Sequence, residues 1–251
     1  MQTGSPRQQV DSAERALRVD LAACHRLAAA YGWSELFAER ISVRLPGPQQ
    51  HLLVGPPGLL GEEVSASSLC MLDRHGQPLT DAPSPTGRPG FALHAALHGA
   101  RPEIGCVLLV HSRAGAALSA QARGIRPVSQ QSAFVLGSLG YHAPAGVYGC
   151  ADHLQLLQDL GAASHLVLRN NALLTVGATV ADAFMHMFRL QAACQIQLSA
   201  QRGGELIGFE AQVYTADDEA GRYVRGGGRG GAFVWPALLR RLDRIDRSYR
   251  D

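Results

Sequence analysis

Three histidines have the types and spacing that suit catalytic or metal chemistry best. His94 and His98 lie four residues apart in the segment LHAALH, a spacing that places both rings on one face of a helix. His111 follows the apolar run CVLLV, where a buried strand would end. An imidazole titrates near pH ~6.5, which suits a general base, and three imidazoles together could hold zinc. The alternative is that His94 and His98 only cap or orient other groups, and that His111 is bonded to the backbone.

Candidate substrate-binding residues occur in two further segments. Arg40 and Ser42 belong to ERISVRLP, and the Arg40 guanidinium could clamp a carboxylate or phosphate through paired hydrogen bonds. Asn171 belongs to VLRNNALLTVG, where its amide could polarise a carbonyl oxygen. Each has a structural alternative, because Arg40 could be solvated at the surface and Asn170 with Asn171 suits a tight turn. We expect most of the remaining histidines on the surface or on helix faces.

These residues must be positioned by alternating helices and strands. Periodic apolar residues predict helices at residues 12–33, 91–102, 113–121, 151–161, 179–202 and 235–251. Short apolar or alternating runs predict strands within residues 40–46, 50–56, 65–79, 104–112 and 164–177, and a further extended piece around Phe134 to Tyr141. The order of elements predicts a three-layer α/β/α domain with a mixed central sheet.

The domain organisation follows from composition along the chain. Residues 1–11 are polar and predict a flexible arm, whereas residues 12–205 carry the α/β pattern. Residues 206–251 form a C-terminal extension, in which the glycine-rich link RGGGRGG precedes the terminal helix. Gly161 follows an apolar helical pattern and is the expected end of that helix.

The composition narrows the classes of partner and the compartment. The 251 residues include 23 basic and 21 acidic side chains, and the net charge of +2 favours neither nucleic acid nor a membrane as a partner. A small-molecule substrate is therefore expected. The five cysteines show no paired spacing, which indicates reduced thiols and a cytoplasmic location. The polar N-terminus predicts no signal peptide, and no run reaches the roughly 18 apolar residues of a membrane span.

Six motifs occur in an order that resembles one known family. They are ERISVRLP, PPGLLGEEVSASSL, GFALHAALHGARPEIGCVLLVHS, PVSQ, LRNNALLTVG and WPALLRRLDRIDRSYRD. Together they are similar to the class II aldolase/adducin family over roughly residues 12–200, with a tail like that of its adducin-like bacterial branch. The resemblance implies a class II aldolase-like fold and a homo-oligomer, commonly a tetramer with sites between subunits.

The resemblance also implies a metal site that this chain has altered. Catalytic members of the family hold a divalent metal, usually zinc, with three histidines, and the matching positions here are Leu109, His111 and Asn171. Leucine has no lone pair to donate, and a carboxamide is a poor zinc ligand compared with imidazole. The glutamate that the family's aldolases use as acid and base matches Gly90. We therefore expect a degenerate site and no metal cofactor.

Three functions fit these residues. The first is a metal-independent lyase, decarboxylase or isomerase of a small carbonyl or carboxylate compound, with His111 as base, the LHAALH histidines as acid or orienting groups, and Arg40 and Asn171 binding substrate. The second is a non-catalytic binding or assembly protein of the adducin type. The third is a metal-dependent aldolase or oxygenase in which His94, His98 and His111 form a relocated Zn²⁺ or Fe²⁺ site. An emptied site should fill with apolar side chains, whereas a working one should keep convergent polar groups.

Overall fold

A mixed β-sheet forms the centre of the protein. The computed structural model describes residues 12–34, 39–79, 89–143, 153–206 and 229–251. The strands are β1 (Arg40–Arg44), β2 (Leu52–Val54), β3 (Cys70–Leu72), β4 (Cys106–Val110), β5 (Leu139–His142), β6 (His165–Leu168) and β7 (Ala172–Gly177). They form one sheet in the order β3-β2-β1-β4-β7-β6-β5. Neighbours are antiparallel except β5 and β6, which are parallel, so the predicted mixed sheet is confirmed.

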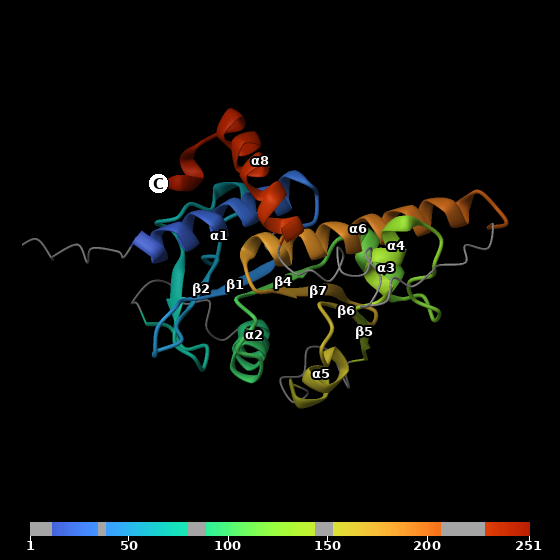
Figure 1. The fold of residues 1–251 in the computed structure, drawn as a ribbon, viewed down its shortest axis with the longest axis horizontal. Coiled ribbons are helices and arrows are strands. Elements are labelled where there is room, and N and C mark those ends of the chain that lie inside the picture. The colour runs from blue at the N-terminus through green and yellow to red at the C-terminus, as the bar shows by residue number, and fades with distance from the viewer. Residues whose placement is uncertain (1–11, 35–38, 80–88, 144–152, 207–228) are drawn as a thin grey trace, which may run out of the picture.

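Helices cover both faces of this sheet, as Figure 1 shows. They are α1 (Ser12–Ala30), α2 (Pro89–Ala100), α3 (Arg113–Ser119), α4 (Gln130–Leu136), α5 (His153–Leu160), α6 (Val180–Arg202) and α8 (Arg229–Ile245), with short 3-10 helices η1 (Gly61–Glu63) and η3 (Ser248–Arg250). One face carries α1, α3, α4, α6 and α8, and we name it the α6 face. The other, the α2 face, carries α2 and α5. The predicted three layers are confirmed.

One buried strand residue departs from the apolar pattern. In β1, Ile41 and Val43 belong to the core on the α6 face. Because successive side chains of a strand alternate between faces, Ser42 between them points to the α2 face. Its strand partner Val107 belongs to the apolar cluster on that same face. Ser42 is fully buried, and a buried hydroxyl group needs hydrogen-bond partners, which the α2 face must supply.

The prediction of an extended segment around Phe134 to Tyr141 is wrong for its first half. It begins with helix α4, and β5 follows only at Leu139. The helix forms because Ser129 caps it: its hydroxyl accepts a hydrogen bond from the backbone N–H of Ser132. In return, the Ser132 hydroxyl accepts one from the backbone N–H of Ser129. This reciprocal capping satisfies two donors at the helix start and outweighs the weak extended pattern of a short segment.

The other predicted helices and strands are confirmed with shifted ends, except that the terminal helix predicted at 235–251 is divided into α8, which ends at Ile245, and η3. Gly161 follows α5 with a φ of 48°, a left-handed conformation that ends the helix as expected. None of the described helices is long and apolar enough to cross a membrane.

The described C-terminal segment packs against the first helix of the domain. Helix α8 begins at Arg229, earlier than the predicted start at Trp235. The indole nitrogen of Trp235 donates a hydrogen bond to the carboxylate of Asp20 in α1, at 2.8 Å. In η3, Tyr249 is fully buried and donates to Asp243 at 2.9 Å. The predicted arm and most of the predicted glycine-rich link lie outside the described residues, so the domain boundaries stay a prediction.

Candidate functional site

A buried hydrogen-bonded array joins β1 to α2. The hydroxyl oxygen of Ser42 lies 2.7 Å from Nδ1 of His94 and 2.8 Å from Nε2 of His98. On its other side the His98 ring is bonded through Nδ1 to the backbone carbonyl oxygen of Ile104, at 3.1 Å. His94 is fully buried and His98 is 3% exposed. The structure thus brings together three of the predicted site residues, and we name Ser42, His94 and His98 the Ser42 array.

The hydrogen-bond partners determine where the protons of the array lie. The Ile104 carbonyl can only accept, so Nδ1 of His98 carries the ring proton. In a neutral ring, Nε2 of His98 then has a lone pair and accepts the Ser42 proton. The Ser42 oxygen accepts in turn from Nδ1 of His94, which must also carry its proton. Nε2 of His94 therefore keeps a lone pair, and this buried atom has no hydrogen-bond partner within the described part of the chain.

Burial keeps both rings of the array neutral. Loss of hydration lowers the pKa of His98 to about 4, although its hydrogen bond to the Ile104 carbonyl opposes this and Arg44 adds to it. The pKa of His94 lies well below its ordinary value, first through burial and then through repulsion by Arg40 and by His98 in its protonated form. Both rings are therefore neutral at neutral pH, as the proton arrangement requires. Arg40 acts on His94 electrostatically, which connects this predicted substrate-binding residue to the array.

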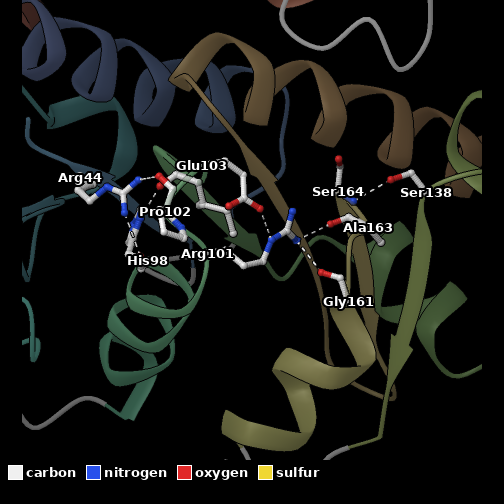
Figure 2. A network of polar contacts seen from close by, with 10 residues as sticks. Arg44, His98, Arg101, Pro102, Glu103, Ser138, Gly161, Ala163 and Ser164 are labelled. Atoms are coloured by element: carbon white, nitrogen blue, oxygen red, sulfur yellow. Dashed lines mark hydrogen bonds and ion pairs between the residues drawn. The ribbon is translucent and has the colours of Figure 1, made fainter. Parts of the chain in front are cut away.

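The end of α2 that carries His98 is held in place by two arginines (Figure 2). Arg44 of β1 donates to the backbone carbonyl of His98 at 3.0 Å. Arg101 donates to the backbone carbonyls of Gly161 and Ala163, each at 3.0 Å, just beyond α5. The last carbonyl groups of a helix lack partners within the helix, so such bonds satisfy them. They fix the helical turn from which the His98 ring reaches Ser42.

Other predicted site residues lie at one end of the sheet. Arg40 begins β1 and pairs there with Leu109, near the end of β4. His111 follows β4 directly, and Asn171 directly precedes β7. Because β4 and β7 are antiparallel neighbours, the end of β4 and the start of β7 lie at the same end of the sheet. The backbone positions of Arg40, His111 and Asn171 therefore share one end of three adjacent strands, next to the Ser42 array.

The asparagine pair forms the turn between β6 and β7. Asn170 has a φ of 56°, a left-handed conformation that asparagine tolerates better than most residues. The backbone N–H of Asn171 lies 3.0 Å from the hydroxyl oxygen of Ser119 at the end of α3. The structural interpretation of this pair as a turn is therefore confirmed. A substrate contact by the Asn171 amide stays a prediction.

The residues at the family's metal positions do not fit a zinc ion. Leu109 is 3% exposed and belongs to the apolar cluster on the α2 face, so hydrocarbon fills that position. Only His111 offers an imidazole, and zinc prefers at least three good donors. Nor do His94, His98 and His111 assemble a relocated site, since no three His, Cys, Asp or Glu side chains within the described ranges are grouped so that they could hold a metal. Nδ1 of His94 and Nε2 of His98 are directed at Ser42 instead, and Nδ1 of His98 at the Ile104 carbonyl.

A second polar pair was missed by the sequence analysis. His25 of α1 is 4% exposed, and its Nδ1 lies 3.6 Å from the carboxylate of Glu39. Burial raises the pKa of Glu39, but His25 and further hydrogen bonds outweigh that and leave the pKa lowered. Both residues and Arg40 border a cavity of about 30 Å³ beneath the turn at Gly55 to Gly58. A Cβ atom at Gly55 would lie 2.6 Å from the His25 ring, so any larger residue there would displace that ring.

The expectation that most other histidines lie on the surface or on helix faces does not hold for two strand residues, His142 of β5 and His165 of β6. His25, His142 and His165 are all buried. Each contacts a residue far away in sequence, as the 2.7 Å contact between His142 and the carboxylate of Asp159 illustrates. No spacing in the sequence could show such pairs, because the sheet creates them.

Known proteins resemble this chain both in sequence and in fold. The model of the family Class II Aldolase and Adducin N-terminal domain matches residues 19–198. A provisionally named class 2 aldolase of Pseudomonas aeruginosa is 45% identical over 96% of this chain and 95% of its own length. Rat alpha-adducin is 36% identical over 96% of this chain, but that match spans only 35% of the adducin.

Solved structures agree with this result. An aldolase II superfamily protein from Pseudomonas syringae has a TM-score of 0.87 and 38% identity, covering 99% of this chain and 100% of that one. An L-fuculose 1-phosphate aldolase from Glaciozyma antarctica has a TM-score of 0.79 and 26% identity, covering 99% of this chain and 97% of that one. The chain belongs to the class II aldolase and adducin family.

Proposed function

We propose that this chain moves a proton at the carbon next to the carbonyl group of a small carboxylate or phosphate compound, without a metal ion. Lyases, decarboxylases and isomerases of such compounds share an enolate-like intermediate, and its formation or quenching requires that proton transfer. The observation that carries the proposal is the lone pair on Nε2 of His94, which the Ser42 array orients and leaves without a partner within the described residues.

The array offers a path for the proton. When Nε2 of His94 takes a proton from substrate, its Nδ1 proton passes to the Ser42 oxygen, and the Ser42 proton passes to Nε2 of His98. The positive charge then rests on His98, whose Nδ1 proton stays bonded to the Ile104 carbonyl. His98 also stands in the last turn of α2, where the helix dipole favours a cation. Charge is thus moved away from the reacting carbon.

The remaining candidates would bind and activate substrate. Arg40 stands at the sheet end beside the array, and its guanidinium suits a carboxylate or phosphate group. The same positive charge would stabilise an enolate formed next to His94, because charge that develops during a reaction is stabilised by a fixed opposite charge. His111 and Asn171 lie at the same strand end, and their roles as second base and carbonyl-binding amide stay predictions.

Hydrogen–deuterium exchange tests this function. Pyruvate and dihydroxyacetone phosphate carry exchangeable protons next to a carbonyl, and deuterium uptake from D₂O is followed by proton NMR. We expect the protein to speed the exchange of at least one compound. General acid–base catalysis contributes about 10²–10⁴-fold, so His94→Gln should lose roughly 10²-fold or more. His75→Gln, at an exposed turn histidine, is the matched control and should exchange like the wild type. Exchange at the buffer rate for both compounds, or equal rates in wild type and His94→Gln, would contradict the proposal.

A non-catalytic role of the adducin type is the second candidate. It is favoured by the 36% identity with rat alpha-adducin over almost the whole chain. In that case the polar array would serve stability alone, and His94→Gln would change unfolding but no exchange rate. The two candidates therefore differ in the outcome of one experiment.

A further inference from the structure

A second and larger cavity lies away from the candidate site. Its volume is about 520 Å³, and it is bordered by α4, the start of β5, the end of α5, and the side chains of His165, His186 and Arg189. Small-molecule sites have volumes of about 300–1,000 Å³. Within β6, Val167 belongs to the core on the α6 face, so His165, two residues before it, points to that face as well. Ser42 points to the opposite face of the sheet.

The cavity also lies far from the Ser42 array along the sheet. β6 is three strands away from β1 in the sheet order, which corresponds to about 14 Å at ~4.8 Å for each pair of neighbouring strands. Moreover, His165 begins β6, whereas the Asn171 turn follows its other end. The cavity therefore shares no residue with the Ser42 array or with the strand end that carries Arg40.

Two imidazole rings border this cavity, those of His165 and His186. Nδ1 of His165 lies 2.9 Å from the carbonyl oxygen of Ser138, and Nδ1 of His186 lies 2.8 Å from that of Val176. A carbonyl only accepts, so both Nδ1 atoms carry protons and both Nε2 atoms have lone pairs in the neutral rings. The ring centres are 5.0 Å apart. Nε2 of His165 is buried and has no hydrogen-bond partner within the described residues.

Both rings are neutral at neutral pH. Burial is the main cause and lowers the pKa of His165 to about 3. Repulsion by Arg189, and by His186 in its protonated form, acts in the same direction, while backbone hydrogen bonds at Ser138 and His186 oppose it. The pKa of His186 is also lowered, again first by burial. A neutral imidazole whose Nε2 lone pair has no partner accepts a hydrogen bond from a hydroxyl group, so this wall of the cavity suits a ligand that carries hydroxyl groups.

A positive charge borders the same cavity. The guanidinium carbon of Arg189 lies 5.4 Å from the centre of the Phe134 ring, and both residues line the cavity. The carboxylate of Asp159 lines it too, but its oxygens are bonded to His142 at 2.7 Å and to Gln155 at 2.8 Å. The cation at Arg189 disfavours a metal ion between the two imidazoles and favours an anion, since guanidinium pairs well with carboxylate.

We propose that this cavity binds a small hydroxy-carboxylate, with the carboxylate group at Arg189 and a hydroxyl group donating to Nε2 of His165. The combination of one fixed cation and neutral acceptors selects for both groups in one molecule. A carboxylate without hydroxyl groups leaves the buried imidazole nitrogen without a partner. A polyol without a carboxylate forms no ion pair with Arg189. Each of them should therefore bind less tightly.

Three probes with six carbons separate these contributions. Gluconate has the carboxylate and the hydroxyl groups, hexanoate has only the carboxylate, and sorbitol has only hydroxyl groups. Binding is followed on the wild-type protein by the NMR signals of the histidine ring protons. We expect gluconate to shift the signals of His165 and His186 and to bind at least tenfold more tightly than either comparator. Shifts confined to His94 and His98 would place the binding in the candidate active site and would overturn this proposal.

Variants test the two contacts. A hydrogen bond to a charged group is worth about 1.5–3 kcal/mol, so Arg189→Gln should weaken gluconate binding by roughly 10- to 100-fold. Arg202→Gln, at an exposed arginine of the same helix, is the matched control and should not change it. His165→Phe keeps a ring but removes Nε2, and should abolish the preference for gluconate over hexanoate. Two results would overturn the proposal: equal binding of all three probes to the wild type, or unchanged gluconate binding in Arg189→Gln. Neither result depends on whether the buried His165→Phe variant folds.

Discussion

Replacing Ser42 with alanine tests the array through stability. The Ser42 hydroxyl group is the shared partner of two ring nitrogens, at 2.7 and 2.8 Å. Its removal leaves Nδ1 of His94 and Nε2 of His98 buried with no partner. A buried polar group without a partner costs about 1–3 kcal/mol, so two of them cost about 2–6 kcal/mol. Ring rotation and entry of water into the vacated space reduce that sum, and we expect the free energy of unfolding to fall by about 2–4 kcal/mol.

Urea unfolding followed by circular dichroism measures this loss at fixed protein concentration. Ser67→Ala is the matched control, because Ser67 is exposed and its hydroxyl lies 3.3 Å from that of Ser65, its one side-chain partner among the described residues. Surface substitutions of this kind usually change stability by less than about 0.5 kcal/mol. If Ser42→Ala lost no more than Ser67→Ala, the hydroxyl group would not be the shared partner of the two rings, and the proton arrangement derived for them would be refuted.

Three further predictions concern other residues. The pKa of His98 falls from 6.5 to about 4 on folding, so the unfolded chain binds the proton first as pH is lowered. The free energy of unfolding should therefore decrease by roughly 3 kcal/mol between pH 6.5 and pH 4. Urea titrations at several pH values measure this dependence, and His98→Gln should flatten it. The double variant Leu109→His with Asn171→His restores the three histidines that the family uses, and elemental analysis should find stoichiometric zinc in it. The wild type should retain less than about 0.1 zinc per chain after dialysis. Stoichiometric zinc in the wild type would contradict the degenerate site. Gly124→Ala should lower stability by about 2 kcal/mol or more, since φ is 60° there and a Cβ atom would clash with the Tyr141 side chain. Gly99→Ala, where a Cβ atom meets no described residue within 4 Å, should be neutral or slightly stabilising in thermal unfolding.

Local patterns in the sequence were enough to predict most of the fold. The apolar run of β4 and the periodicity of α1 and α6 each extend over several residues, and burial on one or both faces produces such patterns directly. The left-handed end at Gly161 was predictable for the same reason, because it depends on one residue and its helix. Helix α4 was missed because its main determinant is a single serine cap rather than a periodic pattern.

The site was predictable only in part. The four-residue spacing of His94 and His98 showed that their rings share a helix face, and Ser42 was singled out on β1. That one hydroxyl group joins both rings follows from the antiparallel pairing of β1 with β4 and from the position of α2, which no local pattern contains. The pairs His25–Glu39 and His165–His186 bring together residues from different elements, so the sequence offered no signal for them.

The most direct measurement of the central claim is the tautomeric state of the two array histidines. Nitrogen-15 NMR of the imidazole rings distinguishes a protonated from an unprotonated ring nitrogen. We predict that His94 and His98 both carry their proton on Nδ1 and leave Nε2 unprotonated, and that neither ring becomes charged between pH 5 and 8. A proton on Nε2 of His94, or titration of either ring near pH ~6.5 as in an unperturbed histidine, would contradict the account.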